Sequence, residues 1–168
     1  MGDLLNQTIM GKAPVLEALS EHPAVKAIVA WNPEALEDAK WEFKELTLTI
    51  AAGEIRAAAA ALQAAGYNFF EDMTAVDWFP ATPRFQLSYH ILSHSYKEHI
   101  RLRVLVEGES PAVDSITPVW PSADYYEREV FDLFGIRFNE HPNLRRIMMP
   151  EDWAGHPLRK DYPVEGYR

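Results

Sequence analysis

The chain has 168 residues, a net charge of −9 and no cysteine. This length suits one domain with one ordinary core, and the lack of cysteine excludes disulfides, thiolate nucleophiles and cysteine-ligated clusters in this chain. The negative charge argues against general nucleic-acid binding, which needs a basic face. No secretory signal pattern or membrane-spanning apolar run is present, so the sequence predicts a cytoplasmic protein.

The first part of the chain predicts strands and helices in alternation. Residues 13–19 suggest a short helix, and residues 24–31 suggest a first strand. Residues 45–50 (ELTLTI) alternate leucine or isoleucine with threonine, which is typical of a half-buried strand. Residues 53–66 then predict a helix, because alanine favours helices and Gly66 can adopt the left-handed conformation that ends one.

Three alternating segments follow, at residues 67–76, 84–92 and 99–108. Sequential alternating strands joined by polar loops indicate an antiparallel meander. The expected fold class is therefore α+β, with a mainly antiparallel sheet and helices packed on one face. Three histidines in this region, His90, His94 and His99, match no familiar pattern of metal ligands, and we interpret them as structural or solvated.

An amphipathic helix is predicted at residues 122–135, with Ser122 as its N-cap and Gly135 at its end. An ion pair between Arg128 and Asp132, four residues apart, would support it. Glu127 and Glu129 are two residues apart and point in different directions, which makes them a poor acid–base pair. We expect Glu127 to face an arginine at an interface or to be solvated.

The body, residues 1–136, is followed by an extended arm, residues 137–168. The arm shows no helix or strand period, and prolines interrupt it repeatedly. It has six basic and five acidic residues, a net charge of +1, whereas the body carries −10. Solvated tails lack large apolar residues, yet this arm contains Leu144, Ile147, Met148, Met149, Trp153, Leu158 and Tyr162. It is therefore predicted to dock on a partner, with Trp153 and Leu158 as buried anchors.

No catalytic, cofactor-binding or metal-binding residue is predicted. The chain lacks a nucleophile elbow, an HExxH motif and a glycine-rich phosphate loop. The alternative is an independent soluble enzyme that uses His141, His156 and Asp161.

Residues 125–163 (YYEREVFDLFGIRFNEHPNLRRIMMPEDWAGHPLRKDYP) resemble the signature region of the C subunit of bacterial NADH:quinone oxidoreductase, the bacterial form of respiratory complex I. The segments DWFPATPRFQLSYHILS, RLRVLV and SITPVWPSA resemble the same family. The end of the chain shortly after Pro163 suggests the stand-alone form of that protein. Related subunits of membrane-bound nickel–iron hydrogenases and of other quinone reductases leave the electron donor open.

The resemblance implies a structural subunit without a cofactor of its own, in a complex that moves electrons from NADH through FMN and iron–sulfur clusters of partner subunits to a quinone and pumps protons. It implies contact with the B, D and I subunits of the quinone module, and a peripheral place on the cytoplasmic face of the inner membrane, reached only through those neighbours. The residues predicted to form the partner interface are Glu127, Arg128, Glu129, Asp132, His141, Arg145, Arg146, Trp153, His156, Leu158, Arg159, Lys160, Asp161 and Tyr162.

Overall fold

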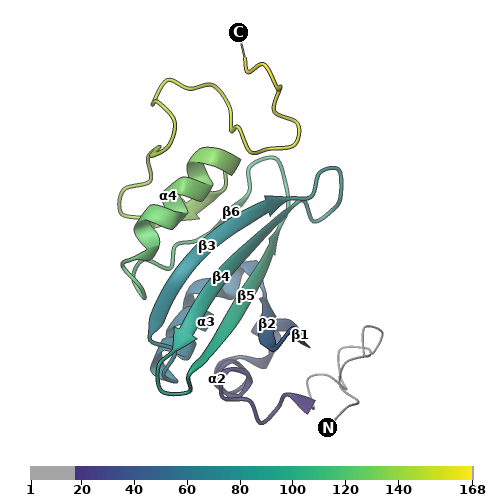
Figure 1. Ribbon diagram of the computed structural model, residues 1–168, viewed down its shortest axis with the longest axis vertical. Coiled ribbons are helices and arrows are strands. Elements are labelled where there is room, and N and C mark those ends of the chain that lie inside the picture. Colours follow the sequence, from purple (N-terminus) through teal and green to yellow (C-terminus); the bar gives the residue numbers. More distant parts are fainter. Residues whose placement is uncertain (1–17, 168) are drawn as a thin grey trace.

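A curved five-stranded sheet organises the chain in a computed structural model that describes residues 18–167 (Figure 1). The strands stand in the order β1-β2-β5-β4-β3, and all neighbours are antiparallel except β2 and β5, which run parallel. The strands are β1 (Leu36–Glu42), β2 (Glu45–Ile50), β3 (Phe69–Asp77), β4 (Phe85–Ser93) and β5 (Glu98–Val106). This confirms the predicted α+β class with a mainly antiparallel sheet, including the meander of the last three strands.

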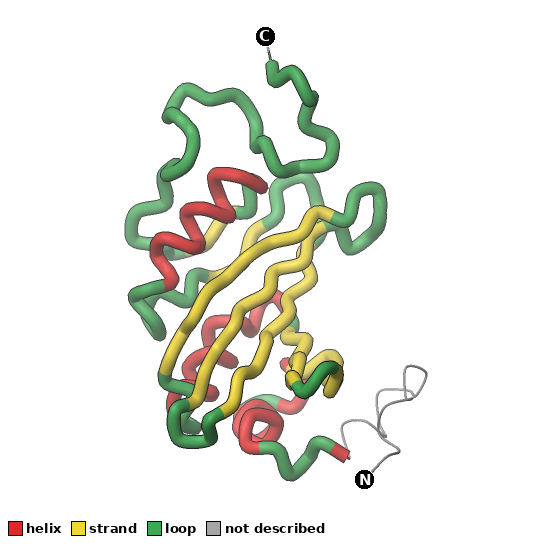
Figure 2. The backbone as a smooth tube through the Cα atoms, in the orientation of Figure 1, coloured by secondary structure: helices red, strands yellow, loops and turns green. Residues whose placement is uncertain are grey.

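The helices supply the rest of the core. Helix α2 (Pro23–Trp31) packs against α3 (Ile55–Ala64), and α4 (Ala123–Phe134) packs against the edge strand β3. Two short 3-10 helices, η1 (Pro33–Ala35) and η2 (Ala52–Glu54), precede β1 and α3. A small parallel pair joins β6 (Ala112–Asp114) to β7 (Arg137–Asn139) on either side of α4. The arm predicted at residues 137–168 therefore begins with a short strand, which corrects the expectation that it has none; after β7 the described chain is loop only, as Figure 2 shows.

Residues 24–31 form helix α2, so the predicted strand is wrong. Pro23 stands in the first turn, where a missing N–H costs nothing, and Nδ1 of His22 accepts a hydrogen bond from the amide of Ala24 at 3.3 Å. Val25 and Ile28 face the core from one side of the helix. Tertiary packing against α3 therefore outweighs the strand preference of the β-branched residues. The helix predicted at residues 13–19 lies largely outside the described residues.

The edge strand β1 was not predicted, because its sequence LEDAKWE lacks a regular alternation. Charged residues are typical of such edges, where they discourage pairing with another chain. In β2 the threonines are buried rather than half-exposed. Thr47 and Thr49 lie beneath Arg101 and Arg103, whose guanidinium groups donate to the two hydroxyls at 2.8–3.1 Å.

Helix α4 begins and ends near its predicted bounds, but its polar contacts differ. Ser122 has helical dihedral angles and makes no capping bond, because the carbonyls of Trp120 and Pro121 already accept from the first amides of the helix. Arg128 pairs with Asp124 rather than with Asp132. Gly135 ends the helix with a φ of +72°, as predicted.

Candidate partner interface on the arm

Asp132, near the end of α4, is the main anchor of the arm. One carboxylate oxygen, Oδ2, accepts hydrogen bonds from three consecutive amides, those of Ile147, Met148 and Met149, at 2.7–2.9 Å. The other oxygen accepts from Nη1 of Arg146, and the side chain is fully buried. Burial alone would raise the pKa of Asp132, but the bonds from Met149 and Arg146 outweigh it and hold that pKa below its usual value.

The arm also covers the last carbonyl groups of α4. A helix ends with carbonyls that have no partner inside the helix, and positive charge is favourable there. The carbonyls of residues 132–134 accept, in order, from Nδ1 of His156, the amide of Leu158 and Nε of Arg159, at 2.9, 3.0 and 2.6 Å. Burial, together with the cations of Arg159 and Arg146, lowers the pKa of His156, so its ring is neutral at pH 7.

Gly135 allows this close packing. Its φ lies in the left-handed region, and a Cβ atom placed there would lie 2.5 Å from the ring of His156 and 2.7 Å from the guanidinium group of Arg159. Both the backbone conformation and the lack of space therefore require glycine at this position.

Gly135→Ala is expected to lower the free energy of unfolding by about 1–2 kcal/mol through backbone strain alone and to displace His156 and Arg159. Urea unfolding would measure the first effect, and the rate of trypsin cleavage after Arg159 would measure the second. Gly53→Ala is the control, because nothing lies within 4 Å of a Cβ atom there and its φ is not in the left-handed region. Equal behaviour of the two variants would contradict the packing role of Gly135.

The β3–β4 hairpin holds a later part of the arm. Nη2 of Arg84 lies 2.7 Å from a carboxylate oxygen of Asp77 and 2.7 Å from one of Asp161, and so bridges the body and the arm. The amide of Lys160 donates to Asp77 at 2.8 Å. Burial alone would raise the pKa of Asp77, but the bonds from Arg84 and Lys160 hold it at about 2.

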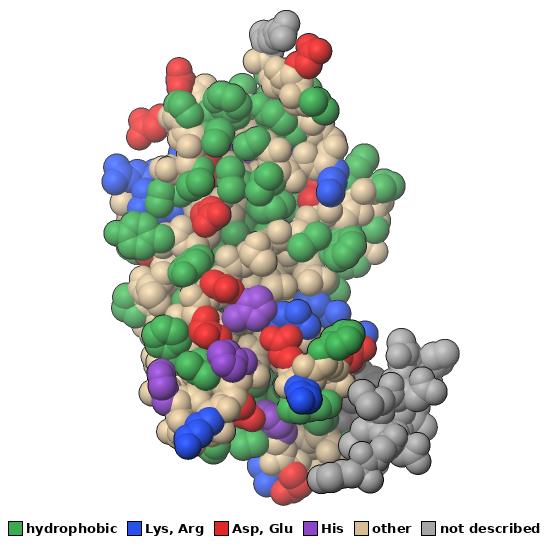
Figure 3. Space-filling view, in the orientation of Figure 1, with side chains coloured by type: hydrophobic (Ala, Val, Ile, Leu, Met, Phe, Trp, Pro, Cys, Tyr) green, Lys and Arg blue, Asp and Glu red, His purple; other side chains and the backbone are tan. Residues whose placement is uncertain are grey.

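Several large apolar side chains of the arm are exposed, whereas Phe138 is buried and Leu144, Met149 and Tyr162 are partly buried. Trp153 has 40% of its surface exposed and Met148 has 57%, and the others with comparable or greater exposure are Ile147, Leu158, Val164 and Tyr167. Figure 3 shows hydrophobic side chains gathered over the end of the molecule that carries α4 and the arm, whereas charged side chains and histidines cover the lower part of this face. Polar groups thus fasten the arm while its apolar groups remain available to another surface.

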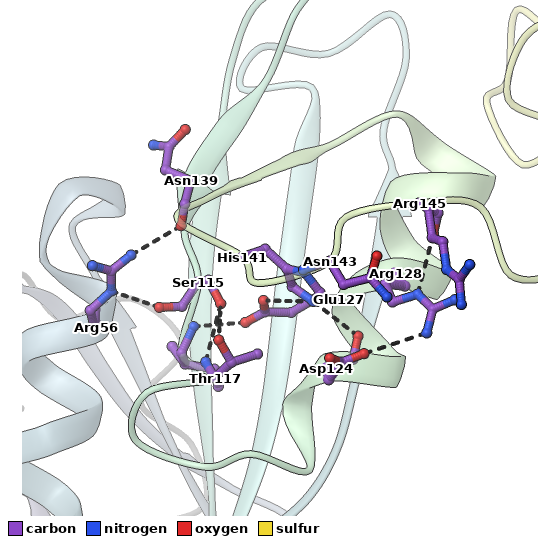
Figure 4. A network of polar contacts seen from close by, with 11 residues as sticks. Arg56, Ser115, Thr117, Asp124, Glu127, Arg128, Asn139, His141, Asn143 and Arg145 are labelled. Atoms are coloured by element: carbon purple, nitrogen blue, oxygen red, sulfur yellow. Dashed lines mark hydrogen bonds and ion pairs between the residues drawn. The ribbon is translucent and has the colours of Figure 1, made fainter.

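Glu127 lies in a buried polar cluster at the start of the arm (Figure 4). Its Oε1 accepts from the amide of Ile116 at 2.7 Å, and its Oε2 lies 3.8 Å from Nε2 of His141. His141 is itself satisfied, because Nε2 donates to the carbonyl of Asp124 at 3.2 Å and Nδ1 accepts from the amide of Asn143 at 3.0 Å. Burial raises the pKa of Glu127 to about 7.

The predicted interface residues fall into three groups. Fully buried side chains belong to Glu127, Asp132 and His141. A second group makes contacts within the chain and is not fully buried. Its members are Arg128, Arg146, His156, Arg159, Asp161 and Tyr162, of which Arg128 is the most buried and Asp161 is exposed. Exposed residues are Glu129, Arg145, Trp153, Leu158 and Lys160. Glu127 is buried, and no arginine among residues 18–167 lies within ion-pair distance of it, which corrects the expectation that it is solvated or faces an arginine. Partner contact stays a prediction for the whole set.

Sequence reasoning missed Asp77 and Arg84 as anchors of the arm; for Gly135 it predicted the end of the helix but not the close packing against His156 and Arg159. The available signal for the first two was a pair of opposite charges at the two ends of one hairpin loop, a spacing that allows contact across the hairpin. Of the candidate enzyme residues, His141 and His156 bond to opposite ends of α4, at the carbonyls of Asp124 and Asp132, whereas Asp161 bonds to Arg84 of the β3–β4 hairpin, so they do not form one cluster. Within residues 18–167 no group of three histidine, aspartate or glutamate side chains is arranged to hold a metal ion.

The family model described as the respiratory-chain NADH dehydrogenase 30 Kd subunit matches residues 48–168. The chain belongs to this family. Among curated members, the NADH-quinone oxidoreductase C subunit of Geobacter sulfurreducens is 44% identical over 131 residues, which cover 74% of this chain and 79% of that one. The corresponding protein of Citrifermentans bemidjiense is 51% identical over 100 residues, covering 60% of this chain and 62% of that one.

Two solved structures share the fold. A trypsin-resistant fragment of Nqo5 superposes with a TM-score of 0.64 and 26% identity, covering 73% of this chain and 99% of the fragment. A chain of an archaeal membrane-bound sulfane sulfur reductase has a TM-score of 0.71 at 24% identity, covering 83% and 84%, and this likeness concerns the fold alone. The match spans less than two thirds of the length of the Citrifermentans relative. No helix among residues 18–167 has the length and apolar character to cross a membrane.

Proposed function

We propose that this chain is a structural subunit of an NADH:quinone oxidoreductase and that its arm docks on neighbouring subunits. In this proposal the chain carries no cofactor, and FMN and iron–sulfur clusters of the partners pass electrons from NADH to a quinone, coupled to proton translocation. Its neighbours are the B, D and I subunits of the quinone module, through which it sits on the cytoplasmic face of the inner membrane. Membership of the 30 Kd subunit family supports this proposal.

The observation that carries the proposal is that polar groups of the arm bond to the body, whereas apolar side chains of the arm are exposed. Several of its polar groups bond within the chain, to Asp132, to the end of α4 and to Arg84, while several of its large apolar side chains are exposed. A segment that is already ordered loses less conformational entropy when it binds. Such an arm therefore suits permanent docking better than catalysis, which needs convergent polar groups in a pocket.

Trp153→Asp is expected to release the protein from its complex, because a carboxylate would replace an apolar anchor at the predicted interface. Met148→Asp, at a more exposed position, should weaken the association in the same way and leaves the contacts of Asp132 with backbone amides intact. Tagged full-length variants expressed in the host would be purified, and the partner polypeptides recovered would be quantified by mass spectrometry.

Phe43→Asp is the matched control, since Phe43 is 97% exposed in the turn between β1 and β2. Normal assembly of both arm variants would refute docking through the arm. Turnover of a substrate by the purified chain alone, abolished by His156→Ala, would instead support an independent enzyme.

A further inference from the structure

Arg128, on α4, and Arg145, near the start of the arm, are neighbouring cations that are not fully neutralised by carboxylates of the described residues. Nε of Arg128, on α4, donates to the backbone carbonyl of Arg145 at 3.3 Å. Figure 4 shows both side chains on the side of α4 that faces away from the Glu127 cluster. The adjacent ring of Tyr125, on the same helix, lies 5.7 Å from the guanidinium carbon of Arg128.

The side chain of Arg128 is 10% exposed, yet its charge is only loosely compensated. One carboxylate oxygen of Asp124 lies 3.5 Å from Nη1 of Arg128, which is long for a charge-assisted hydrogen bond. No second carboxylate among residues 18–167 lies within ion-pair distance of Arg128. A buried cation normally has close, well-aligned partners, because desolvation is costly.

Arg145 adds a second cation without a counter-charge. Its side chain is exposed, and no carboxylate in the described part of the chain lies within ion-pair distance of it. The neighbouring Arg146, by contrast, is committed to Asp132. Arg145 is therefore free to bind a group outside this chain.

We propose that Arg128 and Arg145, with Tyr125 beside them, form a receptor site for one carboxylate side chain of a neighbouring protein subunit. The planar fork of a guanidinium group matches the two oxygens of a carboxylate, so this ligand fits the two arginines best. Tyrosine and arginine are also the residues that most often dominate binding energy at protein interfaces. This inference rests on the proposed function and specifies the chemistry of the partner.

The surrounding charge favours a single acidic side chain over a polyanion. The whole chain carries −9, so nucleic acid would be repelled. An anionic membrane surface is bound by clusters of roughly four to eight basic residues, whereas this site offers two. A lone carboxylate needs no more than the pair provides.

The first test compares tagged full-length chains that are purified from the host with their partners. Arg145→Glu is expected to lower the recovery of partner polypeptides roughly 10-fold or more, because it places two carboxylates against each other. Arg145→Lys should cause a smaller loss, since an ammonium group cannot form the bidentate contact. Arg137→Glu, an equal charge change at another exposed arginine, should have no effect.

The second test identifies the ligand. Zero-length carbodiimide coupling of the complex that contains the Arg145→Lys variant should join the amine at position 145 to an aspartate or glutamate of a partner subunit. Coupling only to carboxylates of this chain, while the complex stays intact, would overturn the inference. Arg145-dependent binding to vesicles that contain phosphatidylglycerol would also overturn it, because the ligand would then be a lipid phosphate.

The two proposals fail in different ways. If the wild-type chain recovers no partner polypeptides, the proposed function is wrong. The carboxylate site is then refuted as well, because it requires a partner subunit. If the wild-type chain and Arg145→Glu recover the same partners in equal amounts, the structural role in the complex stands and the carboxylate site is refuted.

Discussion

Asp132→Ala is expected to detach the middle of the arm from α4 at a free-energy cost of about 3 kcal/mol, which is typical of a buried ion pair that loses one member. The variant would leave Arg146 without its carboxylate and the amides of residues 147–149 without their acceptor. Native-state hydrogen exchange is the most direct measurement, because it reports local opening of these amides separately from global unfolding. Their exchange should accelerate roughly 100-fold, since each 1.4 kcal/mol corresponds to a factor of ten.

Glu129→Ala is the matched control for Asp132→Ala, because it removes an exposed carboxylate from the same helix. It should leave exchange at residues 147–149 unchanged. The lowered pKa of Asp132 also fixes the direction of its pH dependence: its stabilising effect is present above the pKa of the unfolded chain and is lost as the pH falls through the folded pKa. Slow exchange of these amides in Asp132→Ala would show that the arm is held by other contacts.

Glu127→Gln is expected to make the protein more stable at pH 8 and to remove a pH dependence of the wild type. The pKa of Glu127 is about 7 in the folded chain and 4.5 for an unperturbed carboxyl group. The folded state thus binds a proton that the unfolded state has lost, and stability falls as the pH rises from about 4.5 to about 7. The shift corresponds to about 3 kcal/mol, at 1.36 kcal/mol for each pKa unit.

The groups around Glu127 support this direction. Burial and the carboxylate of Asp124 disfavour the ionised form, and together they outweigh the hydrogen bond from the amide of Ile116 and the charge of Arg56, which favour it. Oε2 of Glu127 has no hydrogen-bond partner among the described residues, so an amide can replace the carboxyl group without breaking an established bond there.

Urea unfolding at pH 5, 6, 7 and 8 would measure the effect as the difference between wild type and Glu127→Gln. That difference isolates the contribution of Glu127, because both proteins contain the same other titratable groups. Glu129→Gln is the control and should follow the wild type at every pH. Parallel curves for wild type and Glu127→Gln would mean that Glu127 is ionised throughout.

The sequence predicts which residues form the candidate site, and this stays a prediction, but it did not predict the contacts that position them. Trp153, Leu158 and Lys160 were predicted to belong to a docking segment, and they are exposed on the arm. Asp132 was predicted to pair with Arg128, four residues away on the same helix, and instead binds Arg146 and the amides beyond it. A carboxylate on a helix can accept from several donors, on its own helix or on other segments. Which donor it binds depends on the tertiary structure, which here brings residues 146–149 next to Asp132.

The sequence by itself determined the elements whose signal is periodic over adjacent residues. Strands β2 to β5 and helices α3 and α4 follow from alternation and from apolar stripes, and the prolines from Pro142 onward predict the lack of helix and strand in the rest of the arm. Tertiary structure decided what depends on distant groups: the helical state of residues 23–31, the burial of Glu127, and the fastening of the arm to α4 and Arg84. The physical reason is that local preferences involve neighbouring residues, whereas burial and ion pairing are settled only when distant segments meet.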